Sequence, residues 1–393
     1  MSAAAAIATS EGPLRLALAG GGTGGHLTPA LQLLDRLIDT VQLESVLWFT
    51  TGRPVEDRVL DGWESRLPGV RCERVVLPLE DRAHGAPSRS ALLMRSPAAF
   101  WRARRALLEH RSQVLLGTGG YVCLPAALAA RSMRARLLLL EVNASAGSAT
   151  RWLAPLAHRV LHAFDASLPN GAPLLPKHRR TGPPLGRELE AGPARGAERE
   201  QLLSEYGLDP SRPLLWVTGG SQGAASLNGF VQDHAQELID GGFAILHQVG
   251  PDRLNEAVQG LPAEVYAARE FVQPGLRPMR CARVALTRGG AATLAECAAL
   301  RLPSVVVPYP HHVDDHQAKN ALALYGGAEI VREGALGPRT AERLLELARD
   351  DAAHAHMAQA CERALPWGGA SRIASELVSA AVQRAPVPLS ARA

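Results

Sequence analysis

The feature that most constrains the fold is the segment Gly20–His26, in which five of the seven residues are glycine. It follows an apolar run over 14–19, which predicts a buried parallel strand, and precedes an amphipathic stretch over 30–38, which predicts a helix starting near Pro29. The backbone N–H groups of such a turn, together with the helix N-terminus, favour an anion at the carboxyl edge of the sheet. Such turns also serve packing alone. His26 adds a group that can act as a general base or bind a phosphate.

Three later segments repeat this arrangement of an apolar strand, a glycine turn and a helix. The turns are GTGGY at 117–121, GGSQGA at 219–224 and RGG at 288–290. Repeated strand–turn–helix units predict an α/β fold with parallel sheets. Because the pattern restarts at 214, we expect two similar halves.

The length of 393 residues also favours two domains. A stretch rich in glycine, proline and charge over 181–213 separates the two halves. We therefore expect two Rossmann-like domains with a cleft between them. Their order is an N-terminal domain over 1–182, an interdomain linker over 183–212, a C-terminal domain over 213–365 and a segment over 366–393 whose helix packs back on the N-terminal domain.

Composition excludes several classes of protein. Hydrophobic residues make up 47% and charged residues 20% of the chain, which excludes extensive disorder. The net charge of +4 permits anionic ligands or an anionic membrane surface, and without a recognisable nucleic-acid-binding module we expect no nucleic-acid partner. Five scattered cysteines without a CxxC pair favour reduced thiols in a cytoplasm. We expect neither a signal peptide nor a membrane-spanning helix, so that any membrane role is peripheral.

An arginine-rich segment over 81–111 has two interpretations. Its arginines stand among large apolar residues such as Met94, Phe100 and Trp101. A solvated helix face is the simpler interpretation, and a basic, apolar-backed surface that meets anionic lipid is the alternative. They include Arg82, Arg89, Arg95, Arg102, Arg104 and Arg105.

Several polar residues follow predicted strands or glycine turns, where functional side chains gather. Glu141 and Asn143 follow the strand over 137–140, and helix capping is an alternative role for Asn143. Glu296 lies in the helix after the turn at 288–290, where it can stabilise that helix or bind the vicinal hydroxyls of a sugar.

Two further patterns bear on cofactors. The second predicted strand ends at 50–52 without the acidic residue that would hold a dinucleotide's ribose, which argues against a dehydrogenase. His312 and His316 have a spacing that can bind a metal, but a third ligand and an Asp-x-Asp pair are both lacking, so we expect no metal and no cofactor. Asp314 or Asp315 is expected to cap the helix that follows.

Six motifs occur in order along both halves: GGGTGGHLTPAL, GTGGYVCLPAALAA, EVNASAG, GGSQGAASLN, RGGAATLAECAALRLPSVVVPYP and DDHQAKNA. Together they resemble the MurG family, GT-B glycosyltransferases of family 28 in bacterial cell-wall synthesis, over about 14–330. The resemblance implies inverting transfer of N-acetylglucosamine from UDP-N-acetylglucosamine to the 4-hydroxyl of the N-acetylmuramyl sugar of lipid I, undecaprenyl-pyrophosphoryl-N-acetylmuramyl-pentapeptide, which yields lipid II. It also implies a metal-independent reaction at the cytoplasmic face of the inner membrane, with peripheral attachment.

The resemblance implies roles for individual residues. The N-terminal domain would hold the acceptor, with His26 as the catalytic base for its hydroxyl. In the C-terminal domain Glu296 would bind the ribose hydroxyls, Gln317 the transferred sugar and Val272 the uracil through its backbone. The other expected substrate-binding residues are Thr23, Gly24, Gly25, Tyr121, Asn143, Arg187, Ser221, and Ala291, Ala292 and Thr293 at a helix start beside the diphosphate.

Two segments depart from the family's pattern. The family's His-Glu-Gln-Asn is replaced by Leu140, Glu141, Val142 and Asn143. The arginine of the family's Gly-Asn-Pro-Val-Arg is replaced by Gly186, with Arg187 one residue later. These departures keep two alternatives open, a related GT-B enzyme with another UDP-sugar or acceptor and a nucleotide-binding protein without activity.

Overall fold

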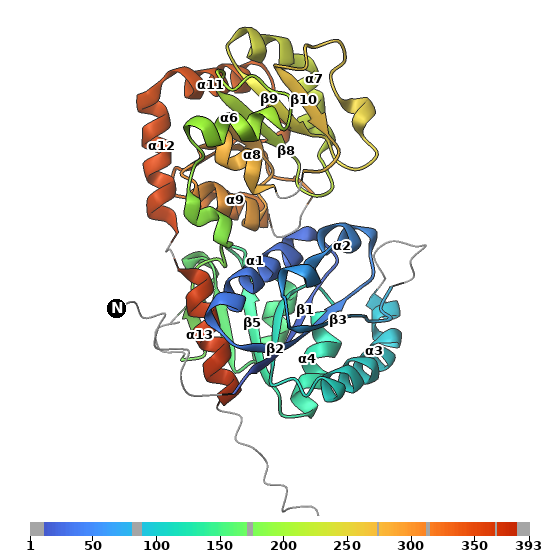
Figure 1. Cartoon of the computed structure of the whole chain (residues 1–393). Coiled ribbons are helices and arrows are strands. Elements are labelled where there is room, and N and C mark those ends of the chain that lie inside the picture. The colour runs from blue at the N-terminus through green and yellow to red at the C-terminus, as the bar shows by residue number, and fades with distance from the viewer. Residues whose placement is uncertain are drawn as a thin grey trace, which may run out of the picture. The chain divides into compact units, whose positions relative to one another are not determined.

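A computed structural model of the chain describes residues 12–80, 89–170, 176–272, 275–311, 315–365 and 368–382. Contacts within the chain divide it into two compact units, Met1–Gly186 with Gly368–Ala393, and Arg187–Trp367. Each unit is built around one parallel β-sheet that helices cover (Figure 1). The α/β class and the two Rossmann-like halves expected from the sequence are confirmed.

The sheet of the first unit has the strand order β3-β2-β1-β4-β5-β6-β7. The order reverses between β1 and β4, and such a switch point is where doubly wound sheets bind their ligands. The two N-terminal glycine turns follow these two strands. The strands are β1 (Leu14–Gly20), β2 (Leu43–Thr50), β3 (Arg71–Val76), β4 (Val114–Gly119), β5 (Arg136–Glu141), β6 (Arg159–His162) and β7 (His178–Arg180).

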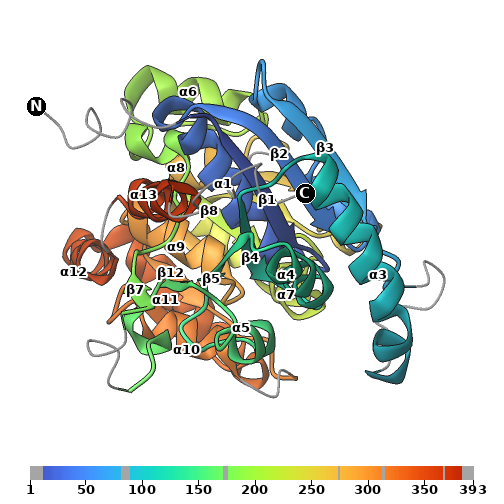
Figure 2. The same ribbon diagram turned by 90° about the horizontal axis from the view of Figure 1, so that it is seen from below.

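Helices cover both faces of this sheet, so the central strands β1 and β4 are buried along nearly their whole length. On one face α1 (Gly24–Thr40) packs beside α13 (Gly369–Val382), and on the other α3 (Arg89–Glu109) packs beside α4 (Cys123–Ser132) (Figure 2). The second face encloses a core that includes Leu47, Phe49 and Leu115. The shorter helices are α2 (Pro54–Val59), η2 (Trp63–Arg66), α5 (Ser148–Leu153) and η3 (Asp165–Ser167).

The helix after the first glycine turn begins earlier than the sequence predicts. The expected start near Pro29 is wrong, because α1 begins at Gly24 and contains Pro29. Glycine and proline have low helix propensity, but Gly24, Leu27 and Pro29 are buried, and this packing outweighs local preference. His26 therefore projects from the first turn of a helix.

The sheet of the second unit has the order β10-β9-β8-β11-β12-β13, which repeats the order of the first six strands of the first unit. Its switch point lies between β8 and β11, so the turns after those strands hold the corresponding positions. The strands are β8 (Leu214–Thr218), β9 (Ala244–Gln248), β10 (Tyr266–Arg269), β11 (Ala282–Thr287), β12 (Ser304–Val306) and β13 (Ala328–Ile330).

Two groups of helices pack in the second unit. One core lies between the sheet and the pair α7 (Ala225–Asp240) and α11 (Pro338–Arg349). The helices α8 (Leu276–Cys281) and α9 (Ala291–Ala299) pack together, and α12 (Asp351–Ala364) packs on α9. The shorter helices are η5 (Arg187–Ala191), η6 (Leu254–Glu256), α10 (His316–Leu322) and η7 (Glu333–Ala335).

The segment 183–212, expected to be a linker, joins the second unit from Arg187 onward. Within it α6 (Gly196–Ser204) packs on α8, and the side chain of Arg199 donates to the carbonyl oxygens of Cys281 and Arg212 at 3.3 and 2.8 Å. The glycines, prolines and charges of the segment suggest a linker, but Leu189 and Leu203 within it are buried. Among the described helices, none is long and apolar enough to cross a membrane.

Candidate active site

The carboxyl ends of β1 and β4 bring the first two glycine turns into contact. Thr118 Oγ1 donates to the carbonyl oxygen of His26 at 2.7 Å. A Cβ atom at Gly119 would lie 2.7 Å from His26 Nε2, and one at Gly120 would lie 2.6 Å from the carbonyl oxygen of Gly21. Gly119 and Gly120 also have positive φ angles of 125° and 81°, which favour glycine. The second turn therefore packs directly against the imidazole of His26.

The contacts of His26 define its tautomer. Its Nδ1 atom lies 2.9 Å from the carbonyl oxygen of Gly21. Because a carbonyl oxygen can only accept, Nδ1 must carry the proton of the neutral ring and donate it. The Nε2 atom then keeps its lone pair. The neutral ring is therefore placed as the Nδ1–H tautomer, whose Nε2 atom is the one that can accept a proton.

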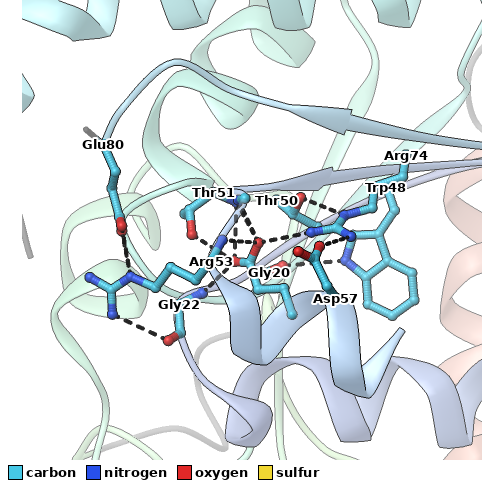
Figure 3. Close-up of polar contacts among 11 residues, drawn as sticks. Gly20, Gly22, Trp48, Thr50, Thr51, Arg53, Asp57, Arg74 and Glu80 are labelled. Atoms are coloured by element: carbon cyan, nitrogen blue, oxygen red, sulfur yellow. Dashed lines mark hydrogen bonds and ion pairs between the residues drawn. The ribbon is translucent and has the colours of Figure 1, made fainter. Parts of the chain in front are cut away.

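The first glycine turn binds one of the chain's own carboxylates. The N–H of Gly22 donates to Glu56 Oε1 at 2.7 Å. Arg53 Nη1 donates to the Gly22 carbonyl oxygen at 3.3 Å (Figure 3). The sequence suggests that the N–H groups of this turn face an anionic ligand, and at Gly22 this is wrong. The reason is that α2 directs a fully buried glutamate into the turn.

The residues between this turn and His26 differ in accessibility. Thr23, at the N-cap of α1, and Gly25 are exposed, whereas Gly24 is buried. Thr23 Oγ1 lies 3.5 Å from His26 Nδ1, too far for more than a weak contact. Thr23 and Gly25 are therefore the accessible members of the expected set at this turn.

Tyr121, in the second turn, packs its ring against the core of the first unit. The Arg53 guanidinium carbon lies 5.9 Å from the centre of that ring, within cation–π range. The Tyr121 hydroxyl is buried and has no hydrogen-bond partner among the described residues. The ring thus belongs to the apolar layer beneath the turns.

A second buried carboxylate organises the loop after β5. Glu141 Oε1 accepts from the Asn143 backbone N–H at 3.0 Å and from its side-chain amide at 3.2 Å. Its Oε2 accepts from the Gly147 N–H at 2.8 Å and from the Thr150 hydroxyl at 2.6 Å. Asn143 does not cap α5, because Gly147 holds the N-cap position. The side chain of Asn143 is instead oriented by the residue two positions before it.

In the second unit Gln317 joins two loops. Its Oε1 accepts from the backbone N–H groups of Gly289 at 3.2 Å and Tyr309 at 2.9 Å. Asn320 Nδ2 donates to the Gly289 carbonyl oxygen at 3.0 Å. Two side chains of α10 therefore bind the N–H and the carbonyl of Gly289, in the turn after β11. Because two N–H groups donate to this atom, it must be the oxygen of the Gln317 amide. The amide nitrogen, Nε2, is then the atom that can donate to a ligand.

Arg288, which is 8% exposed, connects three segments of the same unit. Its guanidinium donates to the carbonyl oxygen of Val307 at 3.0 Å and to Ser226 Oγ at 2.9 Å, and it forms an ion pair with Glu333 at 2.6 Å. The sequence alone does not predict this role. Its only signal was an arginine at a glycine turn directly after a buried strand.

The remaining residues expected to bind the donor follow β8, β10 and β11. Ser221 is half-buried in the turn after β8, and Glu296 is buried in α9. Val272 donates its N–H to Gln248 Oε1 at 2.9 Å, so a backbone contact to uracil would fall to its carbonyl. Ala291, Ala292 and Thr293 form the first turn of α9 after its N-cap residue Gly290.

The two positions that depart from the family's arginine motif lie in different environments. Gly186 is buried, and a Cβ atom there would lie 3.5 Å from Gln32 Cγ of α1. Arg187 is exposed at the start of η5. Of these two residues, the accessible one, Arg187, therefore carries the positive charge.

Over the described ranges, no group of three or more His, Cys, Asp or Glu side chains could hold a metal ion. His312 and Asp314 lie outside the described residues. Asp315 is the N-cap residue of α10, but its side chain makes no capping hydrogen bond there. Its φ of 44° is the reason, since side-chain capping requires an extended backbone at that position.

Comparison with known proteins places both units in one family. The Glycosyltransferase family 28 N-terminal domain matches residues 16–162, and the Glycosyltransferase family 28 C-terminal domain matches residues 214–366. The UDP-N-acetylglucosamine--N-acetylmuramyl-(pentapeptide) pyrophosphoryl-undecaprenol N-acetylglucosamine transferase of Paenarthrobacter aurescens is 36% identical over 340 residues, 84% of this chain and 86% of that protein. The chain belongs to glycosyltransferase family 28. A relative with the same name, from Geobacter metallireducens, is 31% identical over 93% of this chain and 98% of its own length.

Solved structures support the same fold for this family 28 chain. Acinetobacter baumannii MurG superposes with a TM-score of 0.66 at 22% identity, covering 93% of this chain and 99% of that one. The calicheamicin glycosyltransferase CalG4 superposes with a TM-score of 0.67 at 18% identity, covering 95% and 100%. At these identities the likeness concerns the fold, and it agrees with the expected GT-B class.

Proposed function

We propose that this chain transfers N-acetylglucosamine from UDP-N-acetylglucosamine to the 4-hydroxyl of the N-acetylmuramyl sugar of lipid I, undecaprenyl-pyrophosphoryl-N-acetylmuramyl-pentapeptide, forming lipid II. The observation that carries this proposal is the 36% identity, over 84% of the chain, to a transferase whose name states these substrates. The chain is thus a UDP-N-acetylglucosamine-dependent hexosyltransferase.

The first unit supplies the base. Nε2 of His26 accepts the proton of the acceptor 4-hydroxyl as its oxygen attacks the anomeric carbon of the donor sugar and UDP leaves from the opposite side. Attack opposite the leaving group inverts the configuration at that carbon. The support for this role is the Nδ1–H···O=C bond to Gly21, which leaves Nε2 as the basic nitrogen. Thr23, Gly25 and Asn143 lie at the same sheet edge and are the proposed substrate contacts of this unit.

The second unit supplies the donor contacts. The Gln317 amide nitrogen donates to the transferred sugar, Glu296 accepts from the ribose hydroxyls, and the Val272 carbonyl meets the uracil. Ser221, Arg187 and the first turn of α9 face the diphosphate. The N–H groups at the start of α9 carry partial positive charge, which favours the charge that develops on departing UDP.

The first unit also carries a proposed membrane surface on α3. Met94, Trp101 and Leu108 are 83%, 62% and 50% exposed, and their spacing places them on one stripe of the helix. Arg104 lies over the Trp101 ring at 5.6 Å, and Arg102 and Arg105 are exposed nearby. An apolar stripe flanked by arginines fits an anionic membrane surface, and we place the enzyme peripherally on the cytoplasmic face of the inner membrane.

The test is release of UDP from UDP-N-acetylglucosamine by the purified protein with and without a lipid I analogue, with the product identified by mass spectrometry. We expect release to require the acceptor. His26→Ala should lower turnover by about 10²- to 10⁴-fold while UDP binding is retained. Donor binding without release on lipid I would instead indicate another acceptor or a nucleotide-binding protein without activity.

A further inference from the structure

Glu56 is a fully buried carboxylate surrounded by hydrogen-bond donors. Its Oε1 accepts from the backbone N–H of Gly22 at 2.7 Å and from the Thr51 hydroxyl at 2.7 Å. Its Oε2 accepts from the N–H of Gly52 at 2.6 Å and from Arg74 Nη2 at 3.2 Å. Because every one of these neighbours donates, the site suits a carboxylate that accepts only. Its charge is therefore directed, in part, at the Gly22 N–H.

The Gly22 N–H and the Gly21 carbonyl belong to the same peptide group. In a trans peptide these two groups point in opposite directions, so a partner on the N–H and a partner on the carbonyl lie on opposite sides. Here the N–H partner is the Glu56 carboxylate at 2.7 Å, and the carbonyl partner is His26 Nδ1 at 2.9 Å. A single peptide group thus stands between a buried anion and the ring of the proposed base.

The peptide group is held in this orientation from several sides. A Cβ atom at Gly21 would lie 2.5 Å from Glu56 Oε1, so the carboxylate fills the space beside the peptide. On the other side, a Cβ atom at Gly120 would lie 2.6 Å from the Gly21 carbonyl oxygen. The next carbonyl, that of Gly22, accepts from Arg53, whose Nε donates to Glu80 at 2.7 Å. The peptide therefore has little freedom to turn its carbonyl away from His26.

We propose that Glu56 is a positioning residue that acts on His26 through the Gly21–Gly22 peptide group. The carboxylate draws the Gly22 N–H, which polarises the amide and increases the negative charge on the Gly21 oxygen. That oxygen holds the proton on Nδ1 of His26 and orients the ring, so that Nε2 presents its lone pair. In carboxylate–histidine pairs the carboxylate contacts the imidazole directly, whereas here one amide transmits its effect.

This inference rests on the proposed role of His26 as the base, and its readout is chosen to be independent of that role. The tautomer of a histidine can be read from the ¹⁵N chemical shifts of its ring in the intact protein. The chain contains 13 histidines, so the His26 signals are identified by their loss in His26→Ala. In the native protein we expect the Nδ1–H tautomer at a pH where the ring is neutral. Finding Nε2–H there overturns the proposal without any variant of Glu56.

The decisive variants are Glu56→Gln and Glu56→Asp. The first removes the charge, and the second keeps it but withdraws it from the Gly22 N–H, so either variant alone tests the proposal if the other is unstable. Both should show a mixture of His26 tautomers and a kcat lowered by about 10- to 100-fold. The KM for UDP-N-acetylglucosamine should change by less than about threefold, because its proposed contacts lie in the other unit.

Glu141→Gln is the matched control. Glu141 is also buried in the first unit and also accepts backbone N–H bonds, but it contacts the loop after β5. It should leave the His26 tautomer unchanged. A folded Glu56 variant with the native tautomer and the native kcat overturns the proposal. If instead His26→Ala retains full turnover, the assignment of the base fails, while the tautomer measurement still decides whether Glu56 acts on His26.

Discussion

At the scale of single residues, the candidate site is built from side-chain oxygens that accept backbone N–H groups. Glu56 and Glu141 do so in the first unit, and Gln317 does so in the second. In each case one side chain fixes the loop on which another proposed functional group stands. The precision of the site therefore depends on residues that need not touch a substrate.

Gln317 offers a way to separate positioning from binding. Gln317→Glu keeps the oxygen that accepts from Gly289 and Tyr309 but replaces the amide donor, so the loops should stay in place. Loss of one hydrogen bond to the sugar should raise the KM for UDP-N-acetylglucosamine about tenfold. Steady-state kinetics measure this, with Gln201→Glu, on an exposed position of α6, as the control. An unchanged KM would remove Gln317 from the donor site.

Single residues also show what the sequence predicts well and what it does not. The glycines and His26 were recognisable because they occur together in one short segment. Glu56 was not, because its partners in the glycine turn lie 34 residues earlier and its own segment carries no motif. The end of β2 lacks the acidic residue that binds a ribose in dinucleotide-binding domains. An acidic residue, Glu56, follows in α2, but it binds the first glycine turn.

At the scale of elements, vesicle binding can show whether the exposed stripe of α3 is a membrane surface or a solvated helix face. Replacing Met94 and Trp101 by serine should weaken binding to phosphatidylglycerol vesicles at least about tenfold, because it removes the most exposed apolar groups of the stripe. Co-sedimentation measures this, and binding by the native protein should also fall as salt rises. Leu254→Ser, at an exposed apolar residue of the second unit, is the control. Equal vesicle binding by all three proteins would identify α3 as a solvated face.

The strand β9 carries a histidine that makes the second unit sensitive to acid. Burial lowers the pKa of His247 to about 4 from its ordinary value of 6.5, and the ring contacts Tyr266 and Asn228. The unfolded chain therefore binds a proton below about pH 6.5 that the folded unit refuses until about pH 4. Folding stability should fall across this window, by up to about 3 kcal/mol.

Hydrogen exchange of second-unit peptides at pH 7 and pH 4.5 measures this loss. His247→Gln should make the difference smaller, since it removes the titrating group. His356→Gln, at an exposed histidine of α12, should leave it as in the native protein. A loss of stability that is the same in all three proteins would assign the acid sensitivity to other groups.

The bounds of a strand or helix can be predicted from the sequence where they depend on the residues of that segment alone. The strands β1 and β5 run only one residue past the ends of the predicted runs over 14–19 and 137–140, because buried parallel strands are short apolar runs between turns. The start of α1 and the packing of α6 were not predictable. Both depend on contacts with segments distant in sequence, which outweigh glycine, proline and polar composition.

At the scale of the whole molecule, the chain enters the second unit at Arg187 and returns to the first at Gly368. The return is secured by α13, which packs on α1 and buries Ile373 and Leu377. Arg372 Nε also donates to the Thr181 carbonyl oxygen at 2.7 Å. The last described helix thus completes the unit to which the first strand belongs, although the whole second unit separates them in sequence.

Ile373→Ala tests this arrangement. It removes a fully buried side chain from the contact between α13 and the first unit and should lower that unit's free energy of unfolding by about 2–5 kcal/mol. Hydrogen exchange read separately on peptides of each unit measures the effect, and we expect lost protection in α1 and β4 with the second unit unchanged. Ser375→Ala, at an exposed position of the same helix, is the control. Because α1 begins with Gly24, Gly25 and His26, the variant should also lower turnover with less effect on donor binding. Lost protection confined to the second unit would contradict the assignment of α13 to the first.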